Sequence, residues 1–237
     1  MAEVENLSAN TAEELEALRI KYLSKKGAIN DLMADFRNVP AEQKKEVGMR
    51  LNALKTRATE RIAELKEAFE SKGYIFRYFD TSGECCEWLD GQINGKTVGF
   101  GDSQTLFDMG LYEKLSTHNM VYSPMHPKDG EDFYSAAKKC MDTQVYLVSV
   151  NGAAETGEMV NIDGYGNRVS SSLYCHDKIY FVFGINKIMP TLQEAIDRAR
   201  NIAAPKNAKR LHKKTPCAIN GDKCYNCSSP DRICNAM

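Results

Sequence analysis

Apolar residues recur at helical spacing along the N-terminal third of the chain. One series runs from Leu15 to Phe36, and a second runs from Val47 to Phe69. Positions three and four residues apart lie on one face of an α-helix, so each series predicts an amphipathic helix. Residues 1–71 are therefore predicted to form an antiparallel two-helix hairpin, a coiled-coil arm. Its second helix, of about 30 residues, would be about 45 Å long.

From Gly73 onward the hydrophobic pattern changes to short runs. Runs rich in β-branched and aromatic residues alternate with helix-like stretches, which is typical of an α/β layer structure around a mainly parallel sheet. The predicted strands are 74–79, 97–101, 120–123, 144–150 and 179–184, and the predicted helices are 81–90, 130–141 and 190–202. Ligands of such sheets bind beyond the carboxyl ends of the strands, so the loops there are the expected place of a site. We predict three parts: the arm (1–71), an α/β domain (72–210) and a cysteine-rich tail (211–237).

Composition narrows the class of protein. The net charge is −1 and 43% of the residues are hydrophobic, so no general attraction to nucleic acid is expected. No apolar run approaches the ~20 residues of a membrane-spanning helix. The first residues are acidic and polar, unlike a signal or transit peptide. We therefore expect a cytoplasmic protein whose thiols stay reduced.

The loop after the strand at 97–101 is the first candidate for a ligand site. Gly101, Ser103 and Thr105 follow the strand and open a helix. Backbone amides and hydroxyls in such a place can hold a phosphate or a carboxylate. A tight turn with Ser or Asp as the N-cap is the alternative interpretation.

The densest polar stretch follows the strand at 144–150. Carboxylates for acid–base chemistry, amides for orientation and an arginine for an anion are typical of a pocket, although a polar hairpin would also explain the glycines. The candidate catalytic carboxylates are Glu155, Glu158 and Asp163. The candidate ligand-binding residues are Asn151, Asn161, Gly164, Gly166, Asn167 and Arg168, joined by Gly184, Asn186 and Lys187 after the strand at 179–184.

Half of the eight cysteines lie close to the C-terminus, at Cys217, Cys224, Cys227 and Cys234. A central C-x-x-C pair supplies two thiolates from one turn, and one further cysteine lies six residues outside it on each side. Four thiolates suit zinc or an iron–sulfur cluster, and the spacing matches neither template cleanly. We predict a four-cysteine metal site. A tail without metal, including one that forms disulfides in air, is the alternative.

Four motifs occur in order along the second part of the chain: VNIDGYGNRV, GINKI, EAIDRARNIAAPKNAKRL and TPCA…GDKCYNC…SPDRICN. Together they resemble the lactate-utilisation (LUD) domain family over residues 72–237. The resemblance implies the fold of the glucosamine-phosphate isomerase, ribose-phosphate isomerase and CoA-transferase group, with a Rossmann-type, mainly parallel sheet. It also implies a role in bacterial lactate oxidation beside iron–sulfur and oxidoreductase partners, which favours iron–sulfur over zinc in the tail. Members often have Gly-Gly-Ser where this chain has Gly101-Asp102-Ser103.

Residues 12–70, which include ALRIKYLSKKGAINDLMADFRN, resemble the N-terminal coiled-coil arm of the bacterial phenylalanyl-tRNA synthetase α subunit. In that family the arm contacts tRNA, and the basic residues here that could contact phosphates are Arg19, Lys21, Lys25 and Lys26. A solvated charged face is the alternative, because basic and acidic residues are nearly balanced in this segment. The synthetase catalytic domain is absent, so aminoacylation is not expected. The join has no Gly-, Pro- or Ser-rich linker, and an artificial or accidental chimera is its favoured origin, with natural recombination or a gene-model error as the alternatives.

These observations support hypotheses of three classes. The favoured one is a redox accessory protein of lactate utilisation, with a small-anion pocket and a metal-bearing tail. The second is an enzyme of the sugar-phosphate isomerase or CoA-transferase type, in which Glu155, Glu158 or Asp163 acts as base or nucleophile. The third is tRNA binding through the arm. An exposed apolar seam along the arm would also favour pairing of two chains.

Overall fold

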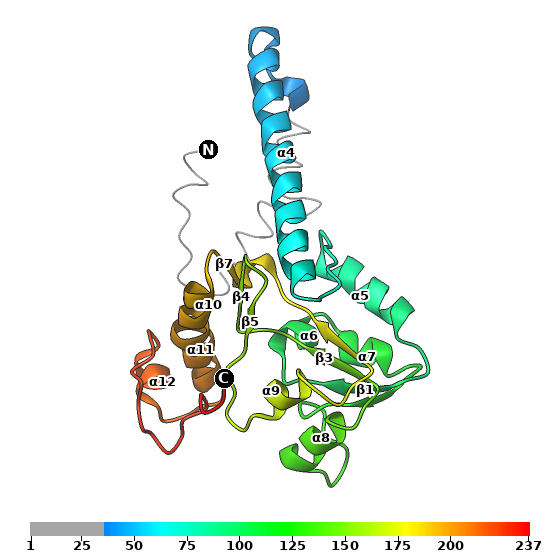
Figure 1. Ribbon diagram of the computed structural model, residues 1–237, viewed down its shortest axis with the longest axis vertical. Helices are drawn as coiled ribbons and strands as arrows, with labels where there is room; N and C mark the ends of the chain where they lie inside the picture. The colour runs from blue at the N-terminus through cyan, green and yellow to red at the C-terminus, as the bar shows by residue number, and fades with distance from the viewer. Residues whose placement is uncertain (1–35) are drawn as a thin grey trace. The chain divides into compact units, whose positions relative to one another are not determined.

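The computed structural model describes residues 36–237, and the predicted first helix of the arm falls outside them. Within the described residues the chain divides into two compact units. The first contains the residues up to Glu67 together with 75–84, and the second contains 68–74 and 85–237. The elements of the second unit can be followed in Figure 1.

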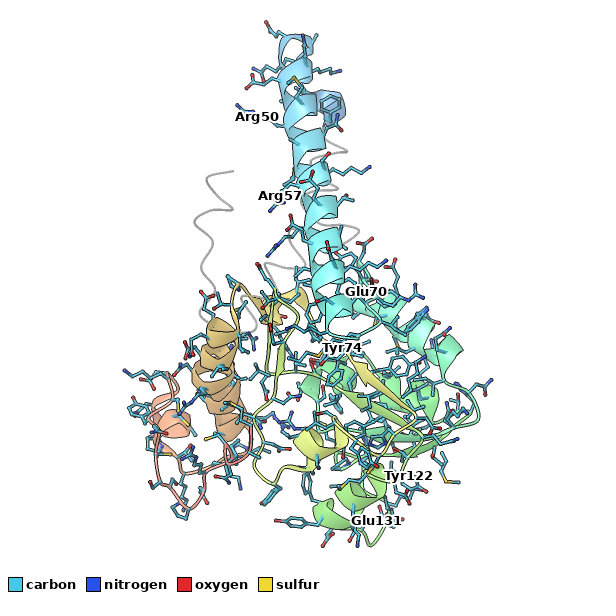
Figure 2. All side chains as sticks on the ribbon, viewed as in Figure 1. Arg50, Arg57, Glu70, Tyr74, Tyr122 and Glu131 are labelled. Atoms are coloured by element: carbon cyan, nitrogen blue, oxygen red, sulfur yellow. The ribbon has the colours of Figure 1, made fainter. Side chains whose placement is uncertain are left out.

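Helix α4 (Ala41–Ser71) matches the predicted second helix of the arm. Pro40 lies immediately before it, where a missing N–H leaves no helical hydrogen bond unmade. Ion pairs lie along its exposed surface, including Arg50–Glu46 at 2.6 Å and Arg57–Glu64 at 2.9 Å. Figure 2 labels the two arginines. Exposed pairs of this kind contribute only about 0–1 kcal/mol each. The hairpin itself stays a prediction.

A four-stranded sheet forms the centre of the second unit. It contains β1 (Thr97–Phe100), β2 (Met120–Tyr122), β3 (Val145–Val148) and β6 (Lys178–Phe181), in the order β2-β1-β3-β6. All neighbouring strands are parallel, which confirms the predicted α/β class with a mainly parallel sheet. The four strands correspond to four of the five predicted runs.

The prediction of a fifth strand at 74–79 is wrong. These residues pair with no strand, and Ile75 is 80% exposed. The Tyr74 ring instead packs edge-on against Phe69 and Phe181, with centroids 6.3 and 6.0 Å away. Aromatic residues are common in strands mainly because they pack well on their neighbours, and Tyr74 finds such neighbours in a ring cluster instead.

Helices cover both faces of this sheet. Successive residues of a strand point to opposite faces, and β3 shows this directly. Val145 and Leu147 belong to one core cluster, whereas Tyr146 and Val148 belong to another that includes Cys140 of α8 (Phe133–Cys140). The first cluster buries residues of the helices α5 (Ser82–Gln92), α6 (Gln104–Asp108) and α7 (Leu111–Leu115).

A second, smaller sheet has the order β5-β4-β7. Its strands are β4 (Gly152–Ala154), β5 (Met159–Val160) and β7 (Ile188–Met189). β4 and β5 pair antiparallel, so part of the polar stretch after β3 is a hairpin. This sheet packs on α10 (Leu192–Arg198) so closely that a Cβ at Gly152 would lie 2.5 Å from the Ala195 carbonyl oxygen.

Helix α10 begins at a capping box, in which Thr191 and Glu194 satisfy each other's backbone amides. It continues through a π-helical segment, Ala199–Ala203, into α11 (Ala204–Arg210). Pro205 lacks an N–H and cannot make a regular helical hydrogen bond, so the wider turn before it has a local cause. The remaining short helices are α9 (Asn167–Ser171), the 3-10 helix η2 (Ile185–Lys187) and α12 (Pro216–Asn220). Among the described residues, no helix combines the length and apolarity needed to cross a membrane.

Candidate functional site

The strand order reverses between β1 and β3. The chain passes from β1 to β2 on one side of β1, and then to β3 on the other side. In parallel α/β sheets, ligands bind at such a reversal, beyond the carboxyl ends of the two strands. Thr105 follows β1, Ser149 directly follows β3, and η2 follows β6. The structure brings these three segments together through one side chain, that of Lys187.

The Lys187 amine lies between two hydroxyl groups. Its Nζ donates to Ser149 Oγ at 2.8 Å and to Thr105 Oγ1 at 3.1 Å. Removal of water by burial lowers the pKa of Lys187 to about 8, and repulsion from Arg198 and Arg168 adds to this shift. Within residues 36–237, no carboxylate contacts this amine. Lys187 is therefore a poorly solvated cation without a counter-ion.

Arg198 adds a second cation of the same kind. Its Nε donates to the Asn186 carbonyl oxygen at 3.1 Å, and its Nη1 donates to the Asn151 carbonyl oxygen. Burial lowers the pKa of Arg198 as well. Arg198 thus joins the loop after β3 to η2, the same two segments that the Lys187 side chain joins. None of the ion pairs in the described part of the chain includes Arg198.

Asn151 and Asn161 shape the loop that Arg198 contacts. The Asn151 amide donates to Asn161 Oδ1 at 3.1 Å, and Asn151 Oδ1 accepts the Ile162 amide at 2.7 Å. The two asparagines therefore satisfy backbone groups on each other's segments. Both were predicted ligand-binding residues, and that role stays a prediction, since their side-chain oxygens are occupied by backbone amides.

Asp163 and Arg168 form a buried unit at the next turn. The Asp163 carboxylate accepts the amides of Gly164 and Arg168, both at 2.8 Å, and lies 3.8 Å from Arg168 Nε. Arg168 Nη2 also donates to the Ile162 carbonyl oxygen at 2.7 Å. The charge of Arg168, unlike that of Arg198, is matched by a carboxylate. Gly166, with φ of 85°, precedes Asn167 at the start of α9 and allows the tight turn.

The other two candidate carboxylates lie on the β4–β5 hairpin. Glu158 pairs with Lys72 at 2.8 Å and accepts the Thr156 hydroxyl. These two hydrogen bonds lower the pKa of Glu158 to about 2, which makes it a weak base at neutral pH. The Glu155 amide donates to the Met189 carbonyl oxygen at 2.8 Å, which ties the hairpin to β7.

The loop after β1 forms the turn that the second interpretation of the sequence expects, and anion binding there stays a prediction. Ser103 is the N-cap of α6, and its hydroxyl accepts the Leu106 amide at 3.4 Å, as the turn interpretation expects. Thr105, two residues later, contacts Lys187. A Cβ at Gly101 would lie 2.9 Å from Val148 Cγ2, and one at Gly184 would lie 2.7 Å from Asn186 Oδ1. Both glycines allow close approach of the chain at the edge of the site.

Two central residues of this site were missed by the sequence analysis, Ser149 and Arg198. Ser149 directly follows an apolar strand, and this position is itself a usable signal, because side chains at strand ends line the crevice. Arg198 lies in a helix that also carries Arg200 and Arg210. Sequence spacing does not reveal which arginine faces the sheet, since the π-helical segment shifts the register of the helix from Ala199 onward.

The four tail cysteines line one pocket of about 20 Å³, together with Arg200, Arg232 and neighbouring residues. Cys224 Sγ accepts the Asn226 amide at 3.3 Å, and Cys234 Sγ accepts Arg232 Nε at 3.2 Å. An adjoining cavity of about 200 Å³ is lined by residues that include Arg200, Arg232, Cys224 and Cys234. The tail therefore gathers its thiols around a common space beside two arginines.

This arrangement does not by itself build a metal site. In the part of the chain that the structure describes, no three His, Cys, Asp or Glu side chains are placed to hold a metal ion. All four tail cysteines are free thiols. The donors that point at Cys224 and Cys234 suit sulfur acceptors, but the four sulfurs do not converge as ligands of one ion. The metal site stays a prediction.

Comparisons with known proteins divide the chain in two. The LUD domain family matches residues 62–237, and the N-terminal domain of class II aminoacyl-tRNA synthetases matches residues 10–73. The phenylalanine–tRNA ligase α subunits of Phocaeicola vulgatus and Bacteroides thetaiotaomicron are each 78% identical over 72 residues. That of Parabacteroides distasonis is 65% identical over 71 residues. Each of these matches covers 30% of this chain and 21% of the relative.

The chain thus spans about a fifth of the length of these ligase subunits, and no solved structure matches it. The two family matches overlap at residues 62–73, almost entirely inside α4. The resemblance of the first segment to the synthetase arm is confirmed. Since the match at residues 62–237 takes in the parallel sheet, the Lys187 site and the cysteine tail, the chain belongs to the LUD domain family.

Proposed function

We propose that the LUD domain binds a small organic carboxylate at the carboxyl ends of β1 and β3, beside Lys187 and Arg198, as an accessory component of lactate utilisation. This strand-end site is called the crevice below. One observation carries this proposal: two poorly solvated cations meet at the carboxyl ends of β1 and β3 without a carboxylate partner in the described chain. Burial of an unpaired charge costs roughly several kcal/mol of folding free energy. Binding of an anion would offset this cost for both cations.

The neighbouring groups suit a short hydroxy or oxo acid. Ser149 and Thr105 supply hydroxyl groups within hydrogen-bond distance of the Lys187 amine. A ligand carboxylate can accept from the Lys187 ammonium and the Arg198 guanidinium, while its hydroxyl or carbonyl oxygen pairs with the side-chain hydroxyls. Charge-assisted hydrogen bonds of this kind contribute about 1.5–3 kcal/mol each.

The isomerase or transferase alternative fits these contacts less well. An acid–base mechanism needs a carboxylate free to take a proton near the substrate. Glu158 is committed to Lys72 and Thr156, and both Asp163 oxygens accept backbone amides. The parallel order β2-β1-β3-β6 supports the Rossmann-type fold group proposed from the sequence, and that fold serves both functions.

Isothermal titration calorimetry on the full chain tests the proposal. Lactate, pyruvate and inorganic phosphate are titrated separately, and we expect saturable heats of binding for the two carboxylates. Lys187→Met should weaken binding about tenfold or more, which corresponds to one lost charge-assisted bond. Lys138→Met, at an exposed lysine of α8, is the matched control and should leave binding unchanged. Equal binding by both variants would contradict the proposal.

The metal-bearing tail and the redox partners are a separate proposal with its own test. Elemental analysis and an absorption spectrum of protein purified without oxygen would support it by stoichiometric iron or zinc that is lost in Cys227→Ser. Iron would favour an iron–sulfur cluster and oxidoreductase partners. Protein with four titratable tail thiols and no metal would rule it out.

The similarity of residues 10–73 to a synthetase domain supports two further proposals. The first is that the join inside α4 has a chimeric origin. The second is tRNA binding through the arm, for which retention of tRNA that falls steeply with salt is the test. The arm residues that would contact phosphates lie outside the described residues.

A further inference from the structure

The Lys187 amine has the surroundings of a nucleophile as well as those of an anion-binding group. Its two neighbours are neutral hydroxyls, which can hydrogen-bond to an ammonium or to a neutral amine. A carboxylate partner would hold the proton on the nitrogen, and none contacts it in residues 36–237. Lysines become nucleophilic when they are poorly solvated or lie beside another cation, and both conditions hold here.

We propose that Lys187 forms an imine with a short 2-oxo carboxylic acid bound in this crevice. The neutral amine adds to the ketone carbon, and one N–H proton passes to the carbonyl oxygen to give a carbinolamine. Loss of that oxygen as water, with the second N–H proton, leaves a carbon–nitrogen double bond. One amine and one ketone are consumed, one imine and one water are formed, and nothing is oxidised or reduced.

The geometry selects a ketone that carries a carboxylate. Arg198 donates to the carbonyl oxygens of Asn186 and Asn151, so its guanidinium is anchored on the residue next to Lys187 and on the loop of Ser149. A carboxylate bound by Arg198 would hold the adjoining carbonyl carbon near Nζ. The Ser149 and Thr105 hydroxyls, both hydrogen-bonded to Nζ, can relay the proton that leaves the nitrogen. An aldehyde without a carboxylate lacks this anchor.

Borohydride trapping on the full chain tests the imine. The protein is incubated with pyruvate, reduced with sodium cyanoborohydride, digested and mapped by mass spectrometry. A trapped imine adds the mass of the acid less one oxygen atom. We expect the adduct at Lys187 to exceed that at the exposed Lys138 of the same molecules roughly tenfold or more, because a desolvated amine is more often neutral. Acetaldehyde should label the two lysines with much less preference for Lys187.

Two variants and one binding measurement separate the possible outcomes. Lys187→Arg removes the primary amine, so it should lose the adduct. Lys138→Arg, at an exposed lysine of α8, is the matched control and should keep both pyruvate binding and the adduct at Lys187. The inference rests on the proposed function, but the two fail differently. Pyruvate that binds without a Lys187 adduct, or adducts spread evenly over exposed lysines, would overturn the imine alone. Absence of carboxylate binding by the wild-type protein would overturn both.

Discussion

The crevice and the cysteine tail gather chemically active side chains in opposite ways. In the crevice, the side chain of Lys187 is hydrogen-bonded to residues far away in the sequence. Ser149 lies 38 positions before it and Thr105 lies 82 positions before it. In the tail, the four cysteines are close in sequence, and the hydrogen bonds of their sulfurs are made within two residues, as with Cys224 and Asn226. The tail has the more conspicuous sequence pattern, whereas the crevice has the more unusual electrostatics.

This difference shows what brings a set of residues together in each region. The crevice depends on the sheet, since only the parallel order of β1, β3 and β6 places the ends of distant segments side by side. The tail depends on short-range turns, which collect thiols around a pocket without directing them at a single ion. Changes to the framework should therefore affect the crevice more than the tail.

The largest effect is expected at the contact between β4 and α10. In Gly152→Ala, the new Cβ would lie 2.5 Å from the Ala195 carbonyl oxygen, so backbone must move. We expect the free energy of unfolding to fall by about 3 kcal/mol, and carboxylate binding to weaken with it. Urea denaturation measures the change. Gly91→Ala is the control, because nothing lies within 4 Å of its Cβ position in α5 and alanine favours a helix. Equal stability of the two variants would show that β4 does not pack as described.

The next effect concerns the buried Asp163. In Asp163→Asn, one oxygen becomes an NH₂ group that faces a backbone N–H, because the Gly164 and Arg168 amides occupy both oxygens. The variant also leaves Arg168 without its carboxylate. We expect a loss of about 2 kcal/mol in the free energy of unfolding. Asp142→Asn, at an exposed position, should change it by less than about 0.5 kcal/mol. An unchanged free energy of unfolding in Asp163→Asn would mean that this carboxylate does not organise the loop.

A smaller effect should appear in the pH dependence of stability. The pKa of Lys187 is lowered from 10.5 to about 8 in the folded chain, so between these values the unfolded chain binds more protons. The contribution of Lys187 to the free energy of unfolding should therefore rise with pH through this window, by on the order of 1 kcal/mol after allowance for its partial exposure. Denaturation at several pH values, compared with Lys187→Met, measures it. An identical slope in the variant would contradict the lowered pKa.

The smallest effect is expected when the tail is changed. Arg200 Nη2 donates to Asn226 Oδ1 at 3.2 Å, and Cys224 donates its amide to Asn201 Oδ1 at 3.2 Å, so the tail contacts the helix that carries Arg198. None of the described contacts of the tail sulfurs reaches Lys187. Cys227→Ser should thus alter the dissociation constant for pyruvate by less than about twofold, which is under 0.5 kcal/mol. The exposed Cys175→Ser is its control. A large loss of pyruvate binding in Cys227→Ser, but not in Cys175→Ser, would show that the tail is part of the binding site.

Much of the sheet was predictable from the sequence, because buried parallel strands are continuous apolar runs. Val145–Val148 is buried throughout and lies inside the strand predicted at 144–150. Residues 74–79 show the limit of this signal. Their aromatic composition is that of a strand, but Tyr74 packs in a ring cluster, and composition does not distinguish the two.

The site was predictable to the level of its loops. The rule that ligands lie beyond strand ends led to Thr105, Asn151 and Lys187. In the structure Lys187 donates to Thr105, and Arg198 donates to the Asn151 carbonyl oxygen. The same rule did not show which of the candidate residues hold their own loop together and which face a ligand. The Asp163 carboxylate accepts amides of its own loop, whereas Lys187 contacts a residue after another strand. Arg198 was missed because the face that a helix turns toward a sheet depends on tertiary packing, which the spacing of residues in the sequence does not show.

The end of the chain carries a consequence for the order of events during synthesis. The Asn235 side chain donates to the Gly164 carbonyl oxygen at 3.1 Å, and the Asn235 and Ala236 amides both donate to the Asp163 carbonyl oxygen at 2.9 Å. The 71 residues between Gly164 and Asn235 take roughly 4–14 s to translate at typical rates. A nascent chain can form its four-stranded sheet during that interval, but the loop of Asp163 must wait for residues made about 71 positions later. We therefore expect this loop to mature after the sheet.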